Sequence, residues 1–524
     1  RLVRQHDLRL REQRPGDGGT LTFAGVGRPE DGGGLCEEAA GHGAGGDEDG
    51  GGLTSFVVFS SLGFFPVCPG KPEYSIGSPL FEDAKIHLPD GKTFEVKANN
   101  VSKDNKYIQS ATLNGKPWNE PTISHADIVA GGVLELEMGP LPNKEWGVKS
   151  SISYDSYKGL AMAGYQGWFF SPAEGSEYAW GFSSADGVYY VDMLPDVLEY
   201  PQTYPIPGRM ADGSHPRVYS AYDYSSVDVH FRWMKEYGLD GVFMQRFIGN
   251  ITNSRRDHYL HVMDNAMSCA ERYDRAICIM YDLSGGEDGT MADVLLDDID
   301  ELNVRYNLFD HGARPSYLWH NGKPLVVVWG IGFMDRAAFY MDEAAKIIDG
   351  LKDRGYSIML GVPTYWREQG EDTRKDARLY DYISKADIIM PWYVGRSDND
   401  TLEDFLKIVP EDVKWCKEHG IGFAGDVWPG FSWENMCPGA DDAVPRRGGE
   451  FLQRQIDACI EAGCESLYIS MFDEVNEGTA IFKIAREVPV PAYRRVIVPL
   501  EDGVPSDRYL TICGEAARRL KEQK

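Results

Sequence analysis

The chain has 524 residues, of which 42% are hydrophobic, and its formal net charge at pH 7 is −28. A chain of this length exceeds one ordinary domain, and its apolar content can fill two sizeable cores. The negative charge argues against nucleic acid and anionic membranes as partners and favours a neutral or cationic ligand. No segment is long and apolar enough to span a membrane.

The first 52 residues are rich in glycine and charge, and we expect this segment to be poorly ordered. The chain begins at Arg1 rather than Met, which is typical of a processed secreted protein or of a fragment. Sequons at Asn100, Asn250 and Asn399 are weak indications of secretion. Nine cysteines without paired spacing predict neither a disulfide framework nor a zinc site.

Short alternating runs predict a small all-β, sandwich-like module in residues 53–150. An apolar stretch from 53 to 67 ends at a turn rich in proline and glycine. Runs of alternating apolar and polar residues then follow, for example Lys85 to Leu88 and Thr93 to Val96. Turn signals such as Asn114 followed by Gly115 separate these runs and favour hairpins.

Eight apolar runs alternate with helical patterns in residues 158–524. This alternation predicts an α/β fold, a (β/α)8 TIM barrel. The long stretch from 168 to 216 is aromatic and rich in glycine and proline, and we expect it to form active-site loops. The runs are 160–165, 241–245, 276–281, 324–329, 357–361, 387–391, 421–425 and 466–472.

Polar and aromatic side chains follow the ends of these predicted strands. A parallel barrel brings the carboxyl ends of its strands to one rim, so we expect these side chains to meet there. Such a mixture favours a carbohydrate pocket over a cofactor site, although for any single tryptophan core packing is the more common role. The predicted substrate-binding residues are Tyr165, Gln166, Trp168, Arg246, Asp282, Trp366, Arg367, Trp392, Arg396, Trp428 and Trp433.

Two carboxylates, Glu474 and Glu477, lie three residues apart just after the eighth run. In one helical turn such positions project from the same side, so both groups can approach one ligand. Paired carboxylates suit glycosidic bond cleavage, which needs a proton donor and a second group to manage the developing cation. The alternative is that these acids cap the start of a helix. Their place after the last strand, opposite an aromatic rim, favours catalysis.

The barrel region resembles a known group of glycoside hydrolases. The segments Gly164 to Phe169 and Glu474 to Thr479 are similar to those of endo-α-mannosidases and endo-α-1,3-glucanases, families 99 and 71. The resemblance implies a retaining endo-glycosidase in which Glu474 deprotonates the sugar 2-hydroxyl, which attacks C1 to form a 1,2-anhydro sugar. Glu477 would be the general acid and then the general base. The chain departs from the family at Asp473, Val475 and Asn476, where an Asn, a Trp and a His are expected.

The first module resembles the C-terminal end of a family 92 exo-α-mannosidase. The likeness lies in residues 46–51, 58–70, 72–81 and 107–115. It implies an inverting, calcium-dependent site whose base carboxylates match Asp47 and Asp49. The helical barrel that carries the general acid in that family does not precede them. We therefore expect a truncated module, inactive alone, with calcium as a cofactor only where the module is complete.

Together these features predict a glycoside hydrolase. We expect it to cleave α-mannan or a related α-linked glycan at bonds within the polysaccharide chain. The expected partner is an oligo- or polysaccharide, with no metal or cofactor for the barrel. A secreted or periplasmic bacterial enzyme is expected. Two alternatives stay open: a non-catalytic carbohydrate-binding protein, and a xylosidase or arabinosidase on the same barrel.

Overall fold

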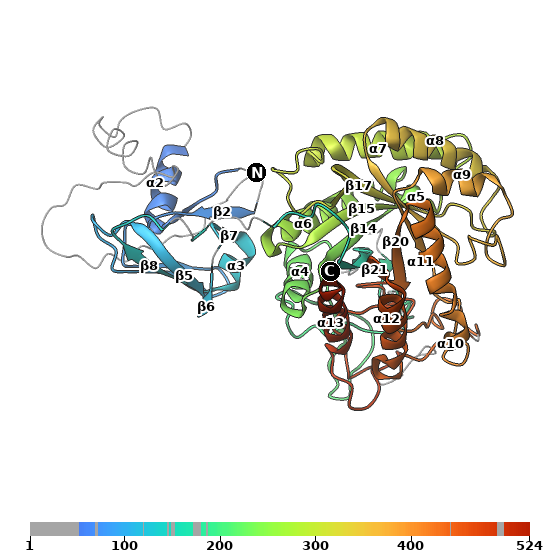
Figure 1. Ribbon diagram of the computed structural model, residues 1–524. Helices are drawn as coiled ribbons and strands as arrows, with labels where there is room; N and C mark the ends of the chain where they lie inside the picture. Colours follow the sequence, from blue (N-terminus) through green and yellow to red (C-terminus); the bar gives the residue numbers. More distant parts are fainter. Residues whose placement is uncertain are drawn as a thin grey trace, which may run out of the picture. The chain divides into compact units, whose positions relative to one another are not determined.

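The computed structural model divides the chain into two compact units, Arg1–Ser150 and Ser151–Lys524 (Figure 1). The segment expected to be poorly ordered, 1–52, lies outside the described residues except for Gly52, which begins a helix. No helix of the described part is both long and apolar enough to cross a membrane. The structure describes residues 52–68, 72–118, 120–143, 146–147, 152–170, 180–184, 187–440, 442–489 and 497–523.

The first unit is built on two sheets that share one hydrophobic core. In the larger sheet β4 and β8 are parallel, whereas its other neighbouring strands are antiparallel. Its strands, in spatial order, are β3 (Asp83–His87), β4 (Thr93–Asn99), β8 (Gly132–Gly139), β5 (Tyr107–Leu113) and β6 (Lys116–Pro117). The smaller sheet has β1 (Phe64–Phe65), β2 (Glu73–Ile76) and β7 (Thr122–Ser124).

The predicted strand pattern is visible in β4, where Phe94, Val96 and Ala98 are buried and alternate with more exposed residues. Asn114 and Gly115 both have positive φ angles and form the tight turn between β5 and β6. The sheet-rich character of this unit is confirmed.

Two helices add to the predicted all-β module. Helix α2 (Gly52–Leu62) is formed by part of the apolar stretch, and Leu62 lies in the core. Helix α3 (His125–Ala130) begins with a capping box, in which Ser124 and Asp127 each accept a hydrogen bond from the other's backbone N–H. The apolar stretch of α2 has no polar face, so its pattern does not distinguish a helix from a strand.

The second unit is a closed barrel of eight parallel strands, which confirms the fold class predicted from the sequence. Each strand pairs with the next, and β21 pairs with β9 to close the barrel, with Leu467 opposite Ala161. A short strand, β16 (Trp319–His320), pairs antiparallel with β17. The barrel strands are β9 (Ala161–Tyr165), β14 (Gly241–Phe247), β15 (Ala276–Asp282), β17 (Lys323–Trp329), β18 (Ser357–Val362), β19 (Ile388–Pro391), β20 (Gly422–Val427) and β21 (Ser466–Ile469).

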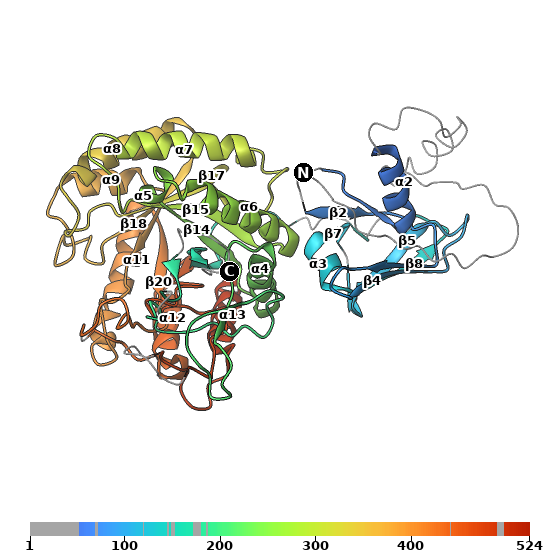
Figure 2. The same ribbon diagram turned by 180° about the vertical axis from the view of Figure 1, so that it is seen from behind.

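Helices form an outer layer around these strands, as both views show (Figures 1 and 2). Glycines end two of these helices. Helices α4 and α12 stop at Gly238 and Gly463, each in the left-handed conformation that favours glycine. The longer helices are α4 (Tyr224–Tyr237), α6 (Arg256–Tyr273), α7 (Met291–Tyr306), α8 (Phe339–Asp353), α9 (Arg378–Lys385), α11 (Ile408–His419), α12 (Glu450–Ala462) and α13 (Arg508–Glu522). Short elements between them include α5 (Ile248–Ile251), α10 (Leu402–Phe405) and η3 (Arg447–Gly449). Further short strands, also outside the barrel, are β10 (Phe169–Phe170), β11 (Trp180–Gly181), β12 (Tyr204–Pro205) and β13 (Arg217–Val218).

The barrel has one core between strands and helices and a second core inside the ring of strands. The inner core takes alternate strand residues, such as Cys278 and Met280 of β15. Gly164 leaves space for it, because a Cβ atom there would lie 2.2 Å from Met471 and 2.3 Å from the Tyr468 hydroxyl. A filled barrel has no pore, so chemistry is confined to the mouth.

Candidate functional site

The loop that carries the two glutamates follows β21 directly and is a turn rather than the start of a helix. Residues 470–489 are all described and contain no helix. The backbone N–H groups of Thr479 and Ala480 both donate to the carbonyl of Glu474, at 3.2 and 3.1 Å. The helix-capping alternative is therefore wrong for these acids.

Glu474 is buried, and each of its carboxylate oxygens accepts one hydrogen bond. Gln166 Nε2 lies 2.9 Å from Oε1, and Thr479 Oγ1 lies 3.0 Å from Oε2. Burial raises the pKa of Glu474 well above its ordinary value, and the charge of Glu477 raises it further. Both donors favour the ionised form of Glu474.

Glu477 is half-buried, and no side chain or backbone group of the described residues donates a hydrogen bond to its carboxylate. Burial raises its pKa to about 7. Two nearby carboxylates in a partly dry site resist double ionisation, so the first ionisation of the pair makes the second harder. The two donors on Glu474 favour its ionised form, whereas its deeper burial and the charge of Glu477 favour its protonated form. Two carboxylates that compete for one proton are an arrangement that can supply one base and one acid.

Asp473 forms hydrogen bonds between this loop and the turn that follows β9, the first strand of the barrel. Its fully buried carboxylate accepts the backbone N–H of Gln166 at 2.8 Å and that of Gly167 at 2.9 Å. Burial raises its pKa to about 6. Its role was not predicted, although its position between a buried strand and Glu474 was a usable signal.

Two residues outside the loop that follows β21 form hydrogen bonds with its backbone. Asp192 is fully buried, accepts from the backbone N–H groups of Glu434 and Asn435 at 2.9 Å each, and donates its own N–H to the Val475 carbonyl. Arg446 donates to the carbonyls of Gly478, at 2.6 Å, and Ala480, at 2.7 Å. Neither was predicted, because both come from loops distant in sequence with no motif around them.

Aromatic and polar side chains from several strands form the floor of the barrel mouth. Gln245 Nε2 donates to the Tyr468 hydroxyl at 2.8 Å. The predicted Trp392 is half-buried, with its ring 6.3 Å from Tyr468 and 5.3 Å from Trp329. The predicted Asp282 ends β15, where burial raises its pKa and Ser284 N donates to it at 2.7 Å. Sequence reasoning missed Trp329 and Tyr468, which occupy strand positions typical of core residues.

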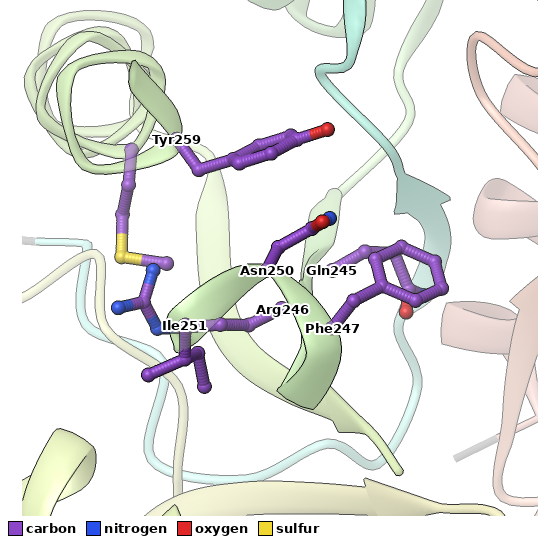
Figure 3. Close-up of a pocket in the computed structure, with 7 residues that line it drawn as sticks. Gln245, Arg246, Phe247, Asn250, Ile251 and Tyr259 are labelled. Carbon is purple, nitrogen blue, oxygen red and sulfur yellow. The ribbon is translucent and has the colours of Figure 1, made fainter. Parts of the chain in front are cut away.

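Arg246 lines a small pocket at the end of β14 (Figure 3), and Trp168 packs against Phe247 of the same lining. Trp168 stacks on Phe247 with ring centres 5.3 Å apart. The Arg246 guanidinium forms a buried ion pair with Asp298, with 2.5 Å between Nε and Oδ2. In Figure 3 the ends of Asn250 and Tyr259 point to one side, away from this guanidinium. The pocket is lined by Gln245, Arg246, Phe247, Asn250, Ile251, Tyr259 and Met263.

Three predicted rim residues lie in the core instead. The Tyr165 hydroxyl is hydrogen-bonded with His230 Nδ1 at 2.8 Å, and the ring is fully buried. Trp366 packs edge-on against Trp415, and Trp428 against Phe451, both without exposed surface. Tyr165 ends β9, and Trp366 and Trp428 follow β18 and β20, but all three side chains pack in the core between strands and helices.

The remaining predicted residues, Arg367, Arg396 and Trp433, are each bound by a carboxylate. Arg367 Nε lies 2.9 Å from Asp412, and Arg396 Nε lies 2.9 Å from Asp372. Trp433 Nε1 donates to Asp442 at 2.6 Å. Its neighbour Ser432 donates its backbone N–H to the Glu477 carbonyl at 2.8 Å, so the Trp433 loop borders the glutamate pair.

No group of three or more His, Cys, Asp or Glu in the described part of the chain could hold a metal ion. Asp47 and Asp49 lie outside the described residues. The calcium dependence implied for a complete module therefore stays a prediction.

Comparison with known proteins finds two different likenesses. Residues 37–140 match the family model described as the glycosyl hydrolase family 92 catalytic domain. A protein of Arthroderma benhamiae, described as an uncharacterized secreted glycosidase, is 43% identical over 100 residues. That match covers 18% of this chain and 12% of the relative, so the chain spans about an eighth of that relative's length.

Among solved structures, the GH99 endo-α-mannosidase of Bacteroides thetaiotaomicron is similar with a TM-score of 0.51 and 15% identity, over 71% of this chain and 99% of that chain. The barrel therefore has the fold of that enzyme. A family GH92 inverting mannosidase of the same species is 47% identical over 20% of this chain and 14% of that chain, with a TM-score of 0.19. The resemblance of the barrel to family 99 is confirmed at the level of the fold, and that of the first unit to family 92 is confirmed by the family model.

Proposed function

We propose that the barrel is a glycoside hydrolase that cleaves α-mannan or a related α-linked glycan, with retention, through a 1,2-anhydro sugar. The observation that carries the proposal is the unequal glutamate pair at the barrel mouth. Glu474 accepts two hydrogen bonds that favour its ionised form, whereas Glu477 accepts none from the described residues and has its pKa raised to about 7 by burial. An acid and a base beside one mouth are what such a reaction needs.

In the first step the Glu474 carboxylate takes the proton of the sugar 2-hydroxyl. The 2-oxygen attacks C1, the bond from C1 to the leaving oxygen breaks, and Glu477 gives its proton to that oxygen. In the second step the Glu477 carboxylate takes a proton from water, which attacks C1. The bond between C1 and the 2-oxygen opens, and Glu474 returns the proton to the 2-oxygen. Two inversions at C1 give net retention.

The choice of mannose rests on two likenesses. The protein that shares the barrel fold is named an endo-α-mannosidase, and the first unit matches a family that includes a named mannosidase. We also propose secretion, because the curated relative is described as a secreted glycosidase. The bacterial origin stays a prediction, since that relative is from Arthroderma and the barrel's structural relative is from Bacteroides.

Incubation of the protein with defined α-mannan, α-1,3-glucan and arabinoxylan tests the proposal. We expect products from α-mannan, with the α-anomer formed first when the reaction is followed by proton NMR. Products from arabinoxylan would replace the proposal with a xylosidase or arabinosidase. Binding to a glycan without any product would make the chain a carbohydrate-binding protein. Release of the β-anomer first would overturn retention.

A further inference from the structure

The carboxylate of Asp473 uses both of its oxygens on one backbone turn. Oδ1 accepts the N–H of Gln166 and Oδ2 accepts the N–H of Gly167. Gly167 has a φ of 60°, and a Cβ atom there would lie 2.9 Å from Val262. The turn after β9 is therefore shaped by a glycine and held by Asp473.

The same turn carries the Gln166 side chain to Glu474. Gln166 Nε2 donates to Glu474 Oε1 at 2.9 Å, so Asp473 is linked to Glu474 by the chain and again through Gln166. Resting on the proposed function, we propose that Asp473 is a positioning residue that fixes Glu474 through Gln166 and adjusts its charge. Asp473 acts through these neighbours and needs no contact with the substrate.

The tyrosines and the histidine near Asp473 and Glu474 stay neutral in the working pH range. Burial raises the pKa of each surrounding tyrosine well above 10, and it lowers the pKa of His230 to about 3. These tyrosines are Tyr165, Tyr200, Tyr219 and Tyr468. Two further carboxyl groups, Asp282 of β15 and Asp426 of β20, raise the pKa of Tyr468 by their charge, and burial raises the pKa of Asp426 to about 7. Charge changes beside Glu474 therefore come from Asp473 and Glu477 first.

The effects of Asp473 and Gln166 on Glu474 have opposite signs. The negative charge of Asp473 raises the pKa of Glu474, and the hydrogen bond from Gln166 lowers it by a smaller amount. In Asp473→Asn the charge is lost, so the pKa of Glu474 falls. In Gln166→Ala the donor is lost and Asp473 remains, so the pKa of Glu474 rises. If the two substitutions only loosened the site, the pKa of Glu474 would shift in the same direction in both variants.

Turnover should follow these shifts. An amide offers one acceptor oxygen to two N–H donors, so Asp473→Asn displaces the turn, and kcat should fall by up to about 100-fold with a smaller change in KM. The acidic limb of the kcat profile, which reports the base Glu474, should move to lower pH in Asp473→Asn and to higher pH in Gln166→Ala.

The test uses the full chain labelled with glutamate carrying carbon-13 in its side-chain carboxyl group. NMR titration follows the Glu474 signal, which is assigned by its loss in Glu474→Gln. Asp426→Asn is the matched control, because Asp426 is equally buried and accepts from Ser470 Oγ and Tyr393 N at 2.7 Å each. We expect a fall in Asp473→Asn, a rise in Gln166→Ala and a smaller change in the control.

Shifts of the same sign in the two variants, or none in Asp473→Asn, would overturn the inference. Gln166→Ala keeps the Asp473 contacts, so an unchanged Glu474 pKa in that variant overturns the link even where Asp473→Asn does not fold. The titration needs no turnover, so it decides the role of Asp473 separately from the proposed function. That function fails by itself where the wild-type chain gives no product from any α-glycan.

Discussion

Charged residues at the strand ends of the barrel fall into two groups, which differ in whether the protein supplies a partner for the charge. Near the end of β14 and after β18 and β19, the protein supplies carboxylate partners to Arg246, Arg367 and Arg396, respectively. After β21, Glu477 accepts no hydrogen bond from the described residues. Partner satisfaction, rather than residue type or position, separates structural charges from groups free to act on a ligand.

The largest expected effect is on the unsatisfied side. Glu477→Gln removes the proton donor and keeps the shape, so hydrolysis should fall by about 100- to 10,000-fold while glycan binding persists. Initial rates and calorimetric binding to the same oligosaccharide measure the two properties. Circular dichroism checks that the fold is intact. Survival of most of the activity would show that Glu477 is not the acid.

On the satisfied side the expected effect is on stability. Asp298→Asn leaves the buried Arg246 charge without its partner, which should cost about 3–5 kcal/mol of unfolding free energy. Arg396→Ala is the control, because its pair with Asp372 is more exposed and should contribute less than about 1 kcal/mol. Urea unfolding at pH 7 measures both. Equal losses would mean that burial does not separate these pairs.

The smallest expected effect is on how the stability of the protein depends on pH. The pKa of Glu477 is raised from an ordinary 4.5 to about 7, so between these pH values the folded state binds more protons than the unfolded state. Stability should therefore fall as pH rises through this window. Glu477→Gln cannot ionise and should be more stable than wild type at pH 8, on the order of 1–3 kcal/mol, with a smaller gap at pH 5. Parallel stability curves for the two proteins would contradict the raised pKa.

The barrel was predictable because each of its strands is a short, contiguous apolar run, as expected for strands buried on both faces. The glutamate pair was predictable because strand ends of a barrel converge. Whether a tryptophan at a strand end faces the mouth was not, since Trp366 and Trp392 look alike in sequence and differ only in what packs around them. Asp192 and Arg446 were beyond sequence reasoning, because their partners are backbone groups of a distant loop.

The proposed mechanism depends most on two different roles, with Glu474 as the base and Glu477 as the acid. It can be tested by measuring the release of the leaving group in a single turnover of two α-mannosides. In one the leaving group is a phenol of low pKa, and in the other it is a sugar. An acid is needed only for the sugar. Glu477→Gln should therefore keep most of its rate on the aryl substrate and lose it on the sugar, whereas Glu474→Gln should lose both. Equal losses on both substrates in Glu477→Gln would contradict the account.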